Sequence, residues 1–448
     1  MFAERRSRLL ERLRARGAAA VVPTSAHKIR NHDSHYRFRP DSDFWYLTGL
    51  AEPDAVLVLR PRGAPGTSGG PQSVLFLREK DREQEIWNGR RLGVAAAPGA
   101  LGVDEARPIE RLHADLPALL EGCERIVYRT GIDEARDRAM LESFARMRAR
   151  ARGLVPPPVE LLDTGPFVHE MRLKKSPAEV AILRRAAAIA REAHVLAMRA
   201  ARPGVGEHEI DALLEHTFRR LGSTGAAYTP IVAGGANATI LHYVENDRPL
   251  VDGDLLLVDA GAESEYYASD VTRTYPVGER FSDDQLALYE IVLGAQQAAI
   301  DAVRPGAAFT DPHERAVRLL CEGLARLGLL KEAAGEAIES GSYRRFYMHR
   351  TSHWLGLDVH DCGAYVQNGA PRVLEPGMVL TIEPGIYVAP DDETVEPRWR
   401  GIGIRIEDDV LVGEAGCEVL TEGIPKTVAE IEEARRRRVP HPRVPAVG

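Results

Sequence analysis

The chain has 448 residues, of which 44% are hydrophobic and 28% are charged, and its formal net charge is −8. This length exceeds one ordinary hydrophobic core and predicts two or three domains. The acidic balance argues against nucleic acid as the main partner, because nucleic-acid-binding proteins present a basic face. Four cysteines without a CxxC pair argue against a thiolate zinc site and a disulfide framework.

The first residues, "MFAERRSRLLERLRARGAAAVVP" (1–23), predict an amphipathic helix of the fold. They lack the apolar core of a secretory signal, and their glutamates and scarcity of serine weigh against a mitochondrial transit helix. No apolar run in the sequence is long enough to span a bilayer. We therefore expect a cytoplasmic protein that has no membrane partner.

Residues 1–170 alternate short apolar runs, such as "AVLVLRP", "SVLFLRE" and "RIVYR", with helical stretches, which is typical of an α/β domain. A new helix is predicted to begin after Ser176, because Pro177 and Glu179 complete a capping box. We predict an N-terminal domain over residues 1–170, a second domain over residues 171–436 and a tail over residues 437–448.

The second domain is predicted to contain an internal repeat. A long helix closes with Arg-Pro-Gly at 202–204 and precedes a helix that ends in "FRRLG". A second long helix closes the same way at 304–306 and precedes a helix that ends in "LARLG". Each helix pair is followed by β-like segments, so we expect two similar α+β halves with a cleft between them. The alternative is a chance recurrence of Arg-Pro-Gly in an arginine-rich chain.

An acidic pair occurs in "LLLVDAGAESEYYASDVTRTYP" (255–276), whose ends read as strands around a turn near residues 263–265. An antiparallel hairpin with that turn places Asp259 directly opposite Asp270, with Cβ atoms about 5 Å apart. Two ionised carboxylates at this distance repel unless one is protonated or a cation lies between them. In the alternative interpretation, Asp259 caps the Ala-Gly turn and Asp270 faces solvent.

A second acidic pair follows near the C-terminus. Glu383 lies where the strand "VLTIEPGIYV" is broken by Pro384. In "GIGIRIEDDVLV" the isoleucines 402, 404 and 406 face one side of the strand, and Arg405 and Glu407 face the other. Because the flanking residues are apolar, a paired Glu407 is favoured over a solvated one.

Histidines cluster between the two acidic pairs. His349, His353 and His360 lie within "MHRTSHWLGLDVHDCG", and His242 precedes the first acidic strand in "ILHYVEND". A lone histidine is usually a core or surface group with a satisfied hydrogen bond. Three histidines within twelve residues of an apolar, glycine-containing stretch indicate a site.

Charge counting favours a dinuclear metal centre. Four carboxylates carry −4, which two divalent cations cancel. A donor set of carboxylates with one imidazole suits manganese or magnesium better than zinc, and manganese is our prediction. Two such ions, about 3.5–4 Å apart, can share a hydroxide nucleophile and polarise a carbonyl group.

The motifs "VDAG", "SDVTRTYP", "SHWLGLDVHD", "TIEPGIY" and "GIRIEDDVLV" occur in an order and spacing that resemble the pita-bread metallopeptidases. This family includes methionine aminopeptidase, prolidase and aminopeptidase P. The resemblance implies an α/β N-terminal domain followed by an α+β pita-bread catalytic domain with a pseudo-twofold internal repeat.

The resemblance also implies roles for individual residues. Asp259 would bind one metal ion, Asp270 and Glu407 would bridge both ions, and His353 and Glu383 would complete the shell of the other. Glu383 would also carry a proton from the bridging hydroxide or water. The remaining residues would act on the substrate or beside the ligands: His360 on the reacting carbonyl and its tetrahedral intermediate, His242 and His349 along the substrate site, and Arg405 beside the ligands.

The N-terminal segments "DSDFWYLTGLAEPDAVLVL" and "REKDREQEIWNGRRLG" are similar to those of aminopeptidase P. This likeness implies hydrolysis of the bond between an N-terminal residue and a following proline, as well as a homo-oligomer (tetramer or dimer). Trp87 would contact substrate or serve as a structural aromatic residue.

Prolidase, which is restricted to Xaa-Pro dipeptides, is the nearest alternative to aminopeptidase P. A non-catalytic pita-bread binding protein is a further one, although such relatives lose ligands that this sequence retains.

Overall fold

The computed structural model describes residues 1–61, 72–150 and 157–437. Its contacts divide the chain into two compact units, Met1–Arg172 and Leu173–Gly448. The tail predicted for residues 437–448 lies, from residue 438 on, outside the described residues. Within the described part of the chain, no helix is both long and apolar enough to cross a membrane.

The N-terminal unit is built on a six-stranded mixed sheet in the order β6-β5-β4-β1-β7-β8. All three apolar runs singled out in the sequence form strands of this sheet, which confirms the α/β prediction. The strands are β1 (Ala18–Pro23), β4 (Val56–Leu59), β5 (Ser73–Leu77), β6 (Glu105–Pro108), β7 (Arg125–Val127) and β8 (Glu160–Leu162), with the hairpin β2 (Ile29–Asn31) and β3 (Ser34–His35) outside the sheet. The helices are α1 (Phe2–Ala15), α2 (Ser42–Thr48), α3 (Arg82–Asn88), α4 (Ala97–Leu101), α5 (Leu112–Leu119), α6 (Glu134–Arg150) and α7 (Glu170–Leu173), the last of which reaches the boundary of the second unit.

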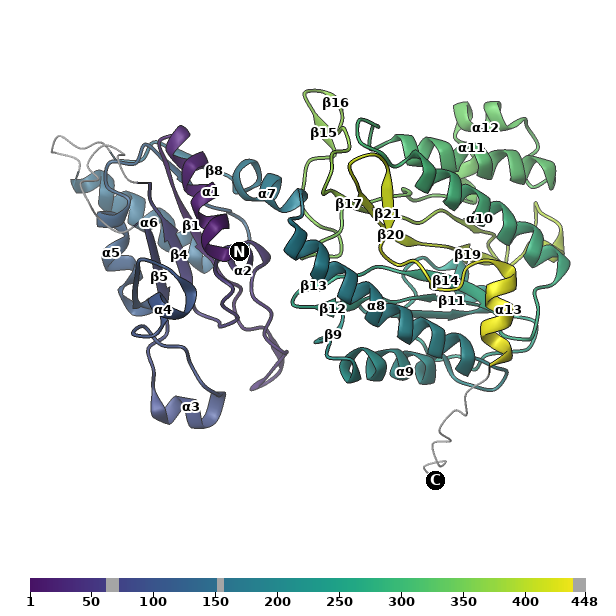
Figure 1. Ribbon diagram of the computed structural model, residues 1–448, viewed down its shortest axis with the longest axis horizontal. Helices are drawn as coiled ribbons and strands as arrows, with labels where there is room; N and C mark the ends of the chain where they lie inside the picture. The colour runs from purple at the N-terminus through teal and green to yellow at the C-terminus, as the bar shows by residue number, and fades with distance from the viewer. Residues whose placement is uncertain (62–71, 151–156, 438–448) are drawn as a thin grey trace. The chain divides into compact units, whose positions relative to one another are not determined.

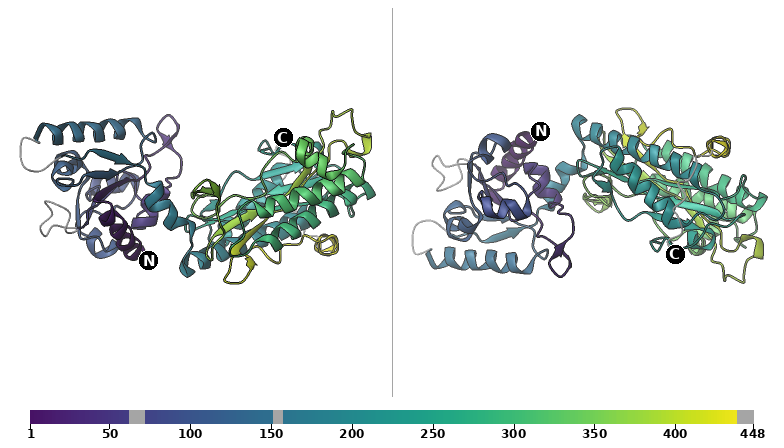
Figure 2. Two further views of the ribbon diagram at one scale, coloured as in Figure 1. Left: turned by 90° about the horizontal axis from the view of Figure 1, so that it is seen from above. Right: turned by 90° about the horizontal axis from the view of Figure 1, so that it is seen from below.

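The C-terminal unit contains the expected repeat. The first half has α8 (Pro177–Ala200) and α9 (Glu207–Arg220) followed by the sheet β10-β11-β14, and the second has α10 (Asp283–Ala302) and α11 (Asp311–Arg326) followed by β17-β20-β21. Both α8 and α10 begin at a serine capping box, at Ser176 and Ser282. Figure 1 shows β11 and β14 between the pair α8 and α9, which is below them in this view, and the pair α10 and α11, which is above them. Figure 2 shows the same helices from two further directions.

The strands of this unit are short. They are β9 (Gly225–Ala226), β10 (Ile231–Gly234), β11 (Leu255–Asp259), β12 (Ala262–Ser264), β13 (Tyr267–Ala268), β14 (Thr272–Pro276), β15 (Val366–Gln367), β16 (Ala370–Pro371), β17 (Val379–Ile382), β18 (Gly385–Tyr387), β19 (Gly403–Arg405), β20 (Asp408–Val412) and β21 (Cys417–Val419). Two more helices, α12 (Ala334–Ser340) and α13 (Val428–Arg436), complete the unit.

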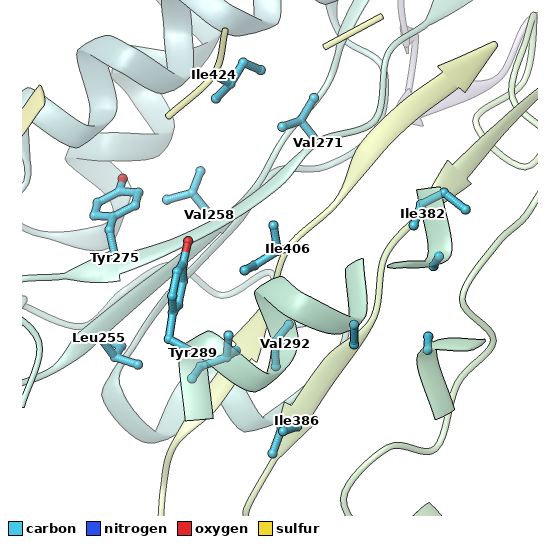
Figure 3. Close-up of a cluster of buried hydrophobic side chains, with 14 of the residues drawn as sticks. Leu255, Val258, Val271, Tyr275, Tyr289, Val292, Ile382, Ile386, Ile406 and Ile424 are labelled. Carbon is cyan, nitrogen blue, oxygen red and sulfur yellow. The ribbon is translucent and has the colours of Figure 1, made fainter. Parts of the chain in front are cut away.

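One hydrophobic core joins the two halves. Figure 3 shows Val258 and Tyr275 of the first half in the same cluster as Tyr289, Val292 and Ile406 of the second. The isoleucines 402, 404 and 406 all belong to this core, as the alternation of the sequence predicted. The opposite face of that strand therefore carries Arg405 and Glu407 toward the site.

Candidate metal centre

All nine side chains that the sequence singled out as ligands or catalytic groups line one cavity of about 890 Å³ in the C-terminal unit. The cavity is bordered by strand ends from both halves of the repeat. The nine residues are Asp259, Asp270, His353, Glu383, Glu407, His242, His349, His360 and Arg405.

The first acidic pair lies close together, but not in the register that we expected. β11 pairs with β14 so that Asp259 lies opposite Thr272, not Asp270. The turn is the reason: Glu265 and Tyr266 both have positive φ, of 46° and 66°, so the hairpin turns one residue later than predicted. A two-residue offset keeps Asp259 and Asp270 on the same face, as diagonal neighbours.

Two local features hold this pair at the strand ends. The Tyr228 hydroxyl lies 2.6 Å from Asp259 Oδ1 and 2.5 Å from Asp270 Oδ1, and its single hydrogen serves one bond at a time. Between the acids, a Cβ on Gly261 would lie 1.7 Å from the Ser269 carbonyl oxygen, so only glycine permits this close approach of the two strands.

The second acidic pair comes from the other half. Glu383 lies at the break between β17 and β18, as predicted, and its Oε1 accepts a hydrogen bond from Thr381 Oγ1 (3.3 Å). Glu407 is only 2% exposed, and its Oε2 accepts from Thr272 Oγ1 (2.7 Å). A threonine of the first half therefore orients a carboxylate of the second.

His353 joins the two acidic pairs. Its Nε2 lies 3.3 Å from Asp270 Oδ2 and 3.6 Å from Glu383 Oε1. Asp270, His353 and Glu407 each offer a ligand atom, and these atoms all lie within 4.8 Å of one another. Such a trio can hold one metal ion.

Arg405 connects the acids to the substrate side of the cavity. Its Nη2 donates to Asp259 Oδ2 (2.6 Å) and its Nη1 to the Tyr387 hydroxyl (3.0 Å). The same hydroxyl lies 2.9 Å from His349 Nε2. Burial lowers the pKa of His349 to about 3, with Arg405 adding to the shift, so the imidazole is neutral.

The four acids carry more negative charge than the nearby cationic side chains can neutralise. Burial raises the pKa of Asp259 and, more strongly, that of Glu407, and it raises the pKa of Glu383 to about 7. Burial acts to lower the pKa of His353, but Asp270 and Glu383 outweigh it and raise that pKa to about 9. Four carboxylates and one imidazole in such a site favour a hard divalent cation, so the residues present fit two ions of this class.

His360 and His242 line the cavity beside the acids. The His360 ring lies 4.3 Å from that of His353, and burial lowers the pKa of His360, which favours the neutral imidazole. His242 lines the cavity from a loop of the first half. Trp87 belongs to the N-terminal unit, where it is 80% exposed on α3, and its contact with substrate stays a prediction.

Sequence reasoning missed Tyr228, Thr272 and Tyr387, which orient the acids and Arg405. Thr272 and Tyr387 lie inside motifs that we quoted, and alternation places Thr272 two residues from Asp270 on the same face. Tyr228 gives no such signal, because it reaches Asp259 from a loop 31 residues earlier.

Comparison with known proteins agrees with this geometry. Residues 181–414 match metallopeptidase family M24, and residues 2–128 match the N-terminal domain of aminopeptidase P. The chain belongs to metallopeptidase family M24. Among M24 relatives, the Xaa-Pro aminopeptidase of Escherichia coli is 44% identical over 431 residues, which are 96% of each chain.

Solved structures of aminopeptidases match nearly the whole chain. The aminopeptidase PepP of Pseudomonas aeruginosa matches with a TM-score of 0.93 and 47% identity, covering 97% of both chains. Zinc-substituted aminopeptidase P of E. coli in complex with product matches with a TM-score of 0.92 and 43% identity over the same share. The predicted architecture, an α/β N-terminal domain and a pita-bread catalytic domain, is confirmed. The protein is a metal-dependent peptide hydrolase.

Proposed function

We propose that this protein removes the N-terminal residue from peptides whose second residue is proline, using two divalent ions, with manganese as the metal. The observation that carries the proposal is the convergence of four carboxylates and His353 in one cavity of a chain with an aminopeptidase P N-terminal domain. The same activity is named for the E. coli relative.

The ligand assignment follows the resemblance to the pita-bread metallopeptidases, and the arrangement of the side chains supports it. Asp270 and Glu407 come from different halves and would lie between the two ions. Asp259, held by Arg405, would complete the shell of one ion, and His353 with Glu383 that of the other. When bound, the ions would supply Lewis acidity that polarises the scissile carbonyl and lowers the pKa of water.

The chain's own groups then move the protons. Glu383, whose carboxylate lines the cavity, would take a proton from the attacking water. It can pass the proton to the proline nitrogen, which must be protonated to leave as a secondary amine. The neutral His360 would donate a hydrogen bond to the oxygen on which charge develops.

Proline recognition falls to the apolar and aromatic wall of the cavity. The imide nitrogen of proline carries no hydrogen, so the site must recognise the ring by its shape. His349 is neutral and packs edge-on against Tyr347, with ring centroids 4.8 Å apart, and His242 and Leu241 line the same cavity. We assign His349 and His242 to this substrate wall.

The deciding test compares two substrates. Enzyme stripped with a chelator and restored with manganese is given Ala-Pro-Ala and Ala-Pro separately, and the products are separated by chromatography. We expect alanine and Pro-Ala from the tripeptide, faster than any cleavage of the dipeptide. Cleavage of Ala-Pro alone would identify a prolidase, and cleavage that does not depend on metal would contradict the proposed centre.

We also propose that the protein is cytoplasmic and forms a homotetramer or homodimer. The proposed oligomer rests on the resemblance of the N-terminal segments to aminopeptidase P. Light scattering on the full chain measures the molar mass directly, and a value equal to the 49.2 kDa chain would contradict it.

A further inference from the structure

A buried arginine links the backbones that carry two of the proposed ligands. Arg273 Nη1 donates to the carbonyl oxygens of Thr272 (3.0 Å) and Glu407 (2.5 Å), and its Nη2 donates to Asp408 Oδ1 (2.7 Å). The side chains of Arg273 and Asp408 are 1% and 0% exposed. Arg273 lies three residues after Asp270, and Asp408 follows Glu407 directly.

The Asp408 carboxylate is fixed from several directions. Besides Arg273, it accepts from Gln296 Nε2 (2.8 Å), Thr421 Oγ1 (2.7 Å) and Lys426 Nζ (2.6 Å). Gln296 comes from α10, Thr421 and Lys426 come from the connection between β21 and α13, and Arg273 comes from the first half. The ion pair therefore joins the first half to Asp408, whose carboxylate is already held by side chains of the second half.

Two backbone contacts repeat this link closer to the ligands. The Glu407 amide donates to the Thr272 carbonyl (3.0 Å), and the Asp270 amide donates to the Asp409 carboxylate (3.1 Å to Oδ2). Each of the two ligands thus has its backbone tied to the opposite half of the repeat.

Stability alone does not account for the pair. Well-packed apolar side chains at such a place are often as stabilising as a buried ion pair, because the charges must first be desolvated. What the ion pair adds is a fixed distance between two strands, since Arg273 donates at once to Asp408 and to the carbonyl oxygens of Thr272, Glu407 and Ile424. A metal centre needs such fixation, because ligand positions must hold to within about 0.5 Å.

We propose that the Arg273–Asp408 ion pair is a positioning device for the metal centre, which sets the separation of Asp270 and Glu407 and thereby the affinity for the metal ions. The inference rests on the proposed function, because it needs ions held by these carboxylates. Neither residue lines the cavity.

The test uses two variants of different severity. Arg273→Lys keeps the charge but cannot reach the carbonyl oxygens of Thr272 and Glu407 together with Asp408. Lys426→Met removes one donor to Asp408 at a side chain that is 21% exposed, and it leaves Arg273 in place. The control is Asp43→Asn, which breaks an ion pair of similar burial, Arg172–Asp43, in the N-terminal unit.

Manganese(II) binding to each chelated protein is measured by titration calorimetry, and folding by thermal unfolding. We expect both variants to bind manganese about 10–100-fold more weakly than the parent, with Arg273→Lys the weaker of the two. Asp43→Asn should unfold at a lower temperature and bind manganese as the parent does.

Each outcome decides the matter. Unchanged manganese affinity in both variants would overturn the proposal, as would an equal loss of affinity in Asp43→Asn, which would mark a general loosening of the fold. If Arg273→Lys does not fold, the affinity of Lys426→Met decides alone. If the parent protein binds no manganese or other divalent ion, the proposed function fails and takes this inference with it.

Discussion

The two units bury carboxylates in opposite ways. In the N-terminal unit, the Asp43 side chain is 4% exposed and accepts from Arg172 Nη1 (2.8 Å), while its other oxygen lies 3.0 Å from His169 Nε2. Burial acts to raise the pKa of Asp43, but His169 and Arg172 outweigh it and hold that pKa well below its usual value. This acid is neutralised by its own chain.

The acids of the C-terminal cavity are not neutralised by their own chain. Among the described residues that line the cavity, Arg405 is paired with Asp259, and burial still raises the pKa of Asp259 and Glu407. This difference separates two kinds of buried carboxylate. Where the chain supplies the countercharge, the carboxylate is a structural element; where it does not, the carboxylate marks a site for a cation from outside.

The largest effect should come from Glu407→Gln, which removes one acid of the cavity without changing its shape. We expect manganese binding and peptidase activity to be lost. In the presence of chelator the thermal unfolding temperature should be unchanged or higher, because the variant relieves charge crowding and keeps the bond from Thr272. Calorimetric metal titration and differential scanning calorimetry measure the two effects. A variant that binds manganese normally, or that unfolds early in chelator, would contradict the comparison.

The same kind of change in the other unit should act in the opposite way. Asp43→Asn removes the carboxylate that pairs with the buried Arg172, and we expect the unfolding free energy to fall by up to about 3–5 kcal/mol. The pH dependence follows from the lowered pKa of Asp43. The stabilisation is complete above the usual carboxyl pKa of about 4 and is lost as pH falls through the lower, folded-state pKa. Denaturation at pH 7 and at pH 3 measures it, and an equal loss in the variant at both would argue against this sign.

A third change separates catalysis from metal binding. His360 lines the cavity, where we propose that it donates to the reacting carbonyl, and it is not one of the proposed ligands. His360→Ala should lower kcat by about 10²–10³-fold, the cost of removing one such donor. The manganese affinity should stay unchanged. A parallel loss of manganese affinity would instead show that His360 supports the neighbouring His353, whose ring lies 4.3 Å away.

The sequence predicted the cavity better than it predicted the hairpin beneath it. Alternation decides which face a side chain occupies, so Arg405 and Glu407 could be assigned from "GIGIRIEDDVLV" alone. The strand register could not be assigned, because the turn at Glu265 and Tyr266 uses positive φ without the glycine or asparagine that usually marks it. The error was harmless to the site, because a two-residue offset preserves the face.

Contacts between distant segments were beyond the sequence for a different reason. No repeat or spacing in the sequence predicts the roles of Tyr228 and Arg273. Each donates a hydrogen bond to a residue more than 30 positions away. The partners of Arg273 in the second half are brought near only when the two halves pack on one core, whereas those of Tyr228 are brought near by the folding of the first half. The ligands could be predicted from the sequence because an unpaired carboxylate in a buried apolar strand costs free energy. An acid inside such a strand pattern therefore indicates a site.

The smallest effect should come from an acid that needs no special partner. Glu418 pairs with Arg184 at 2.7–2.8 Å in a two-pronged geometry, but the side chains are 46% and 50% exposed. Water solvates both charges whether or not they meet, so Glu418→Gln should change the unfolding free energy by less than about 1 kcal/mol. Neither metal affinity nor activity should change. A loss comparable to that of Asp43→Asn would mean that burial is not what separates structural acids from surface ones, and the contrast between the two units would lose its physical basis.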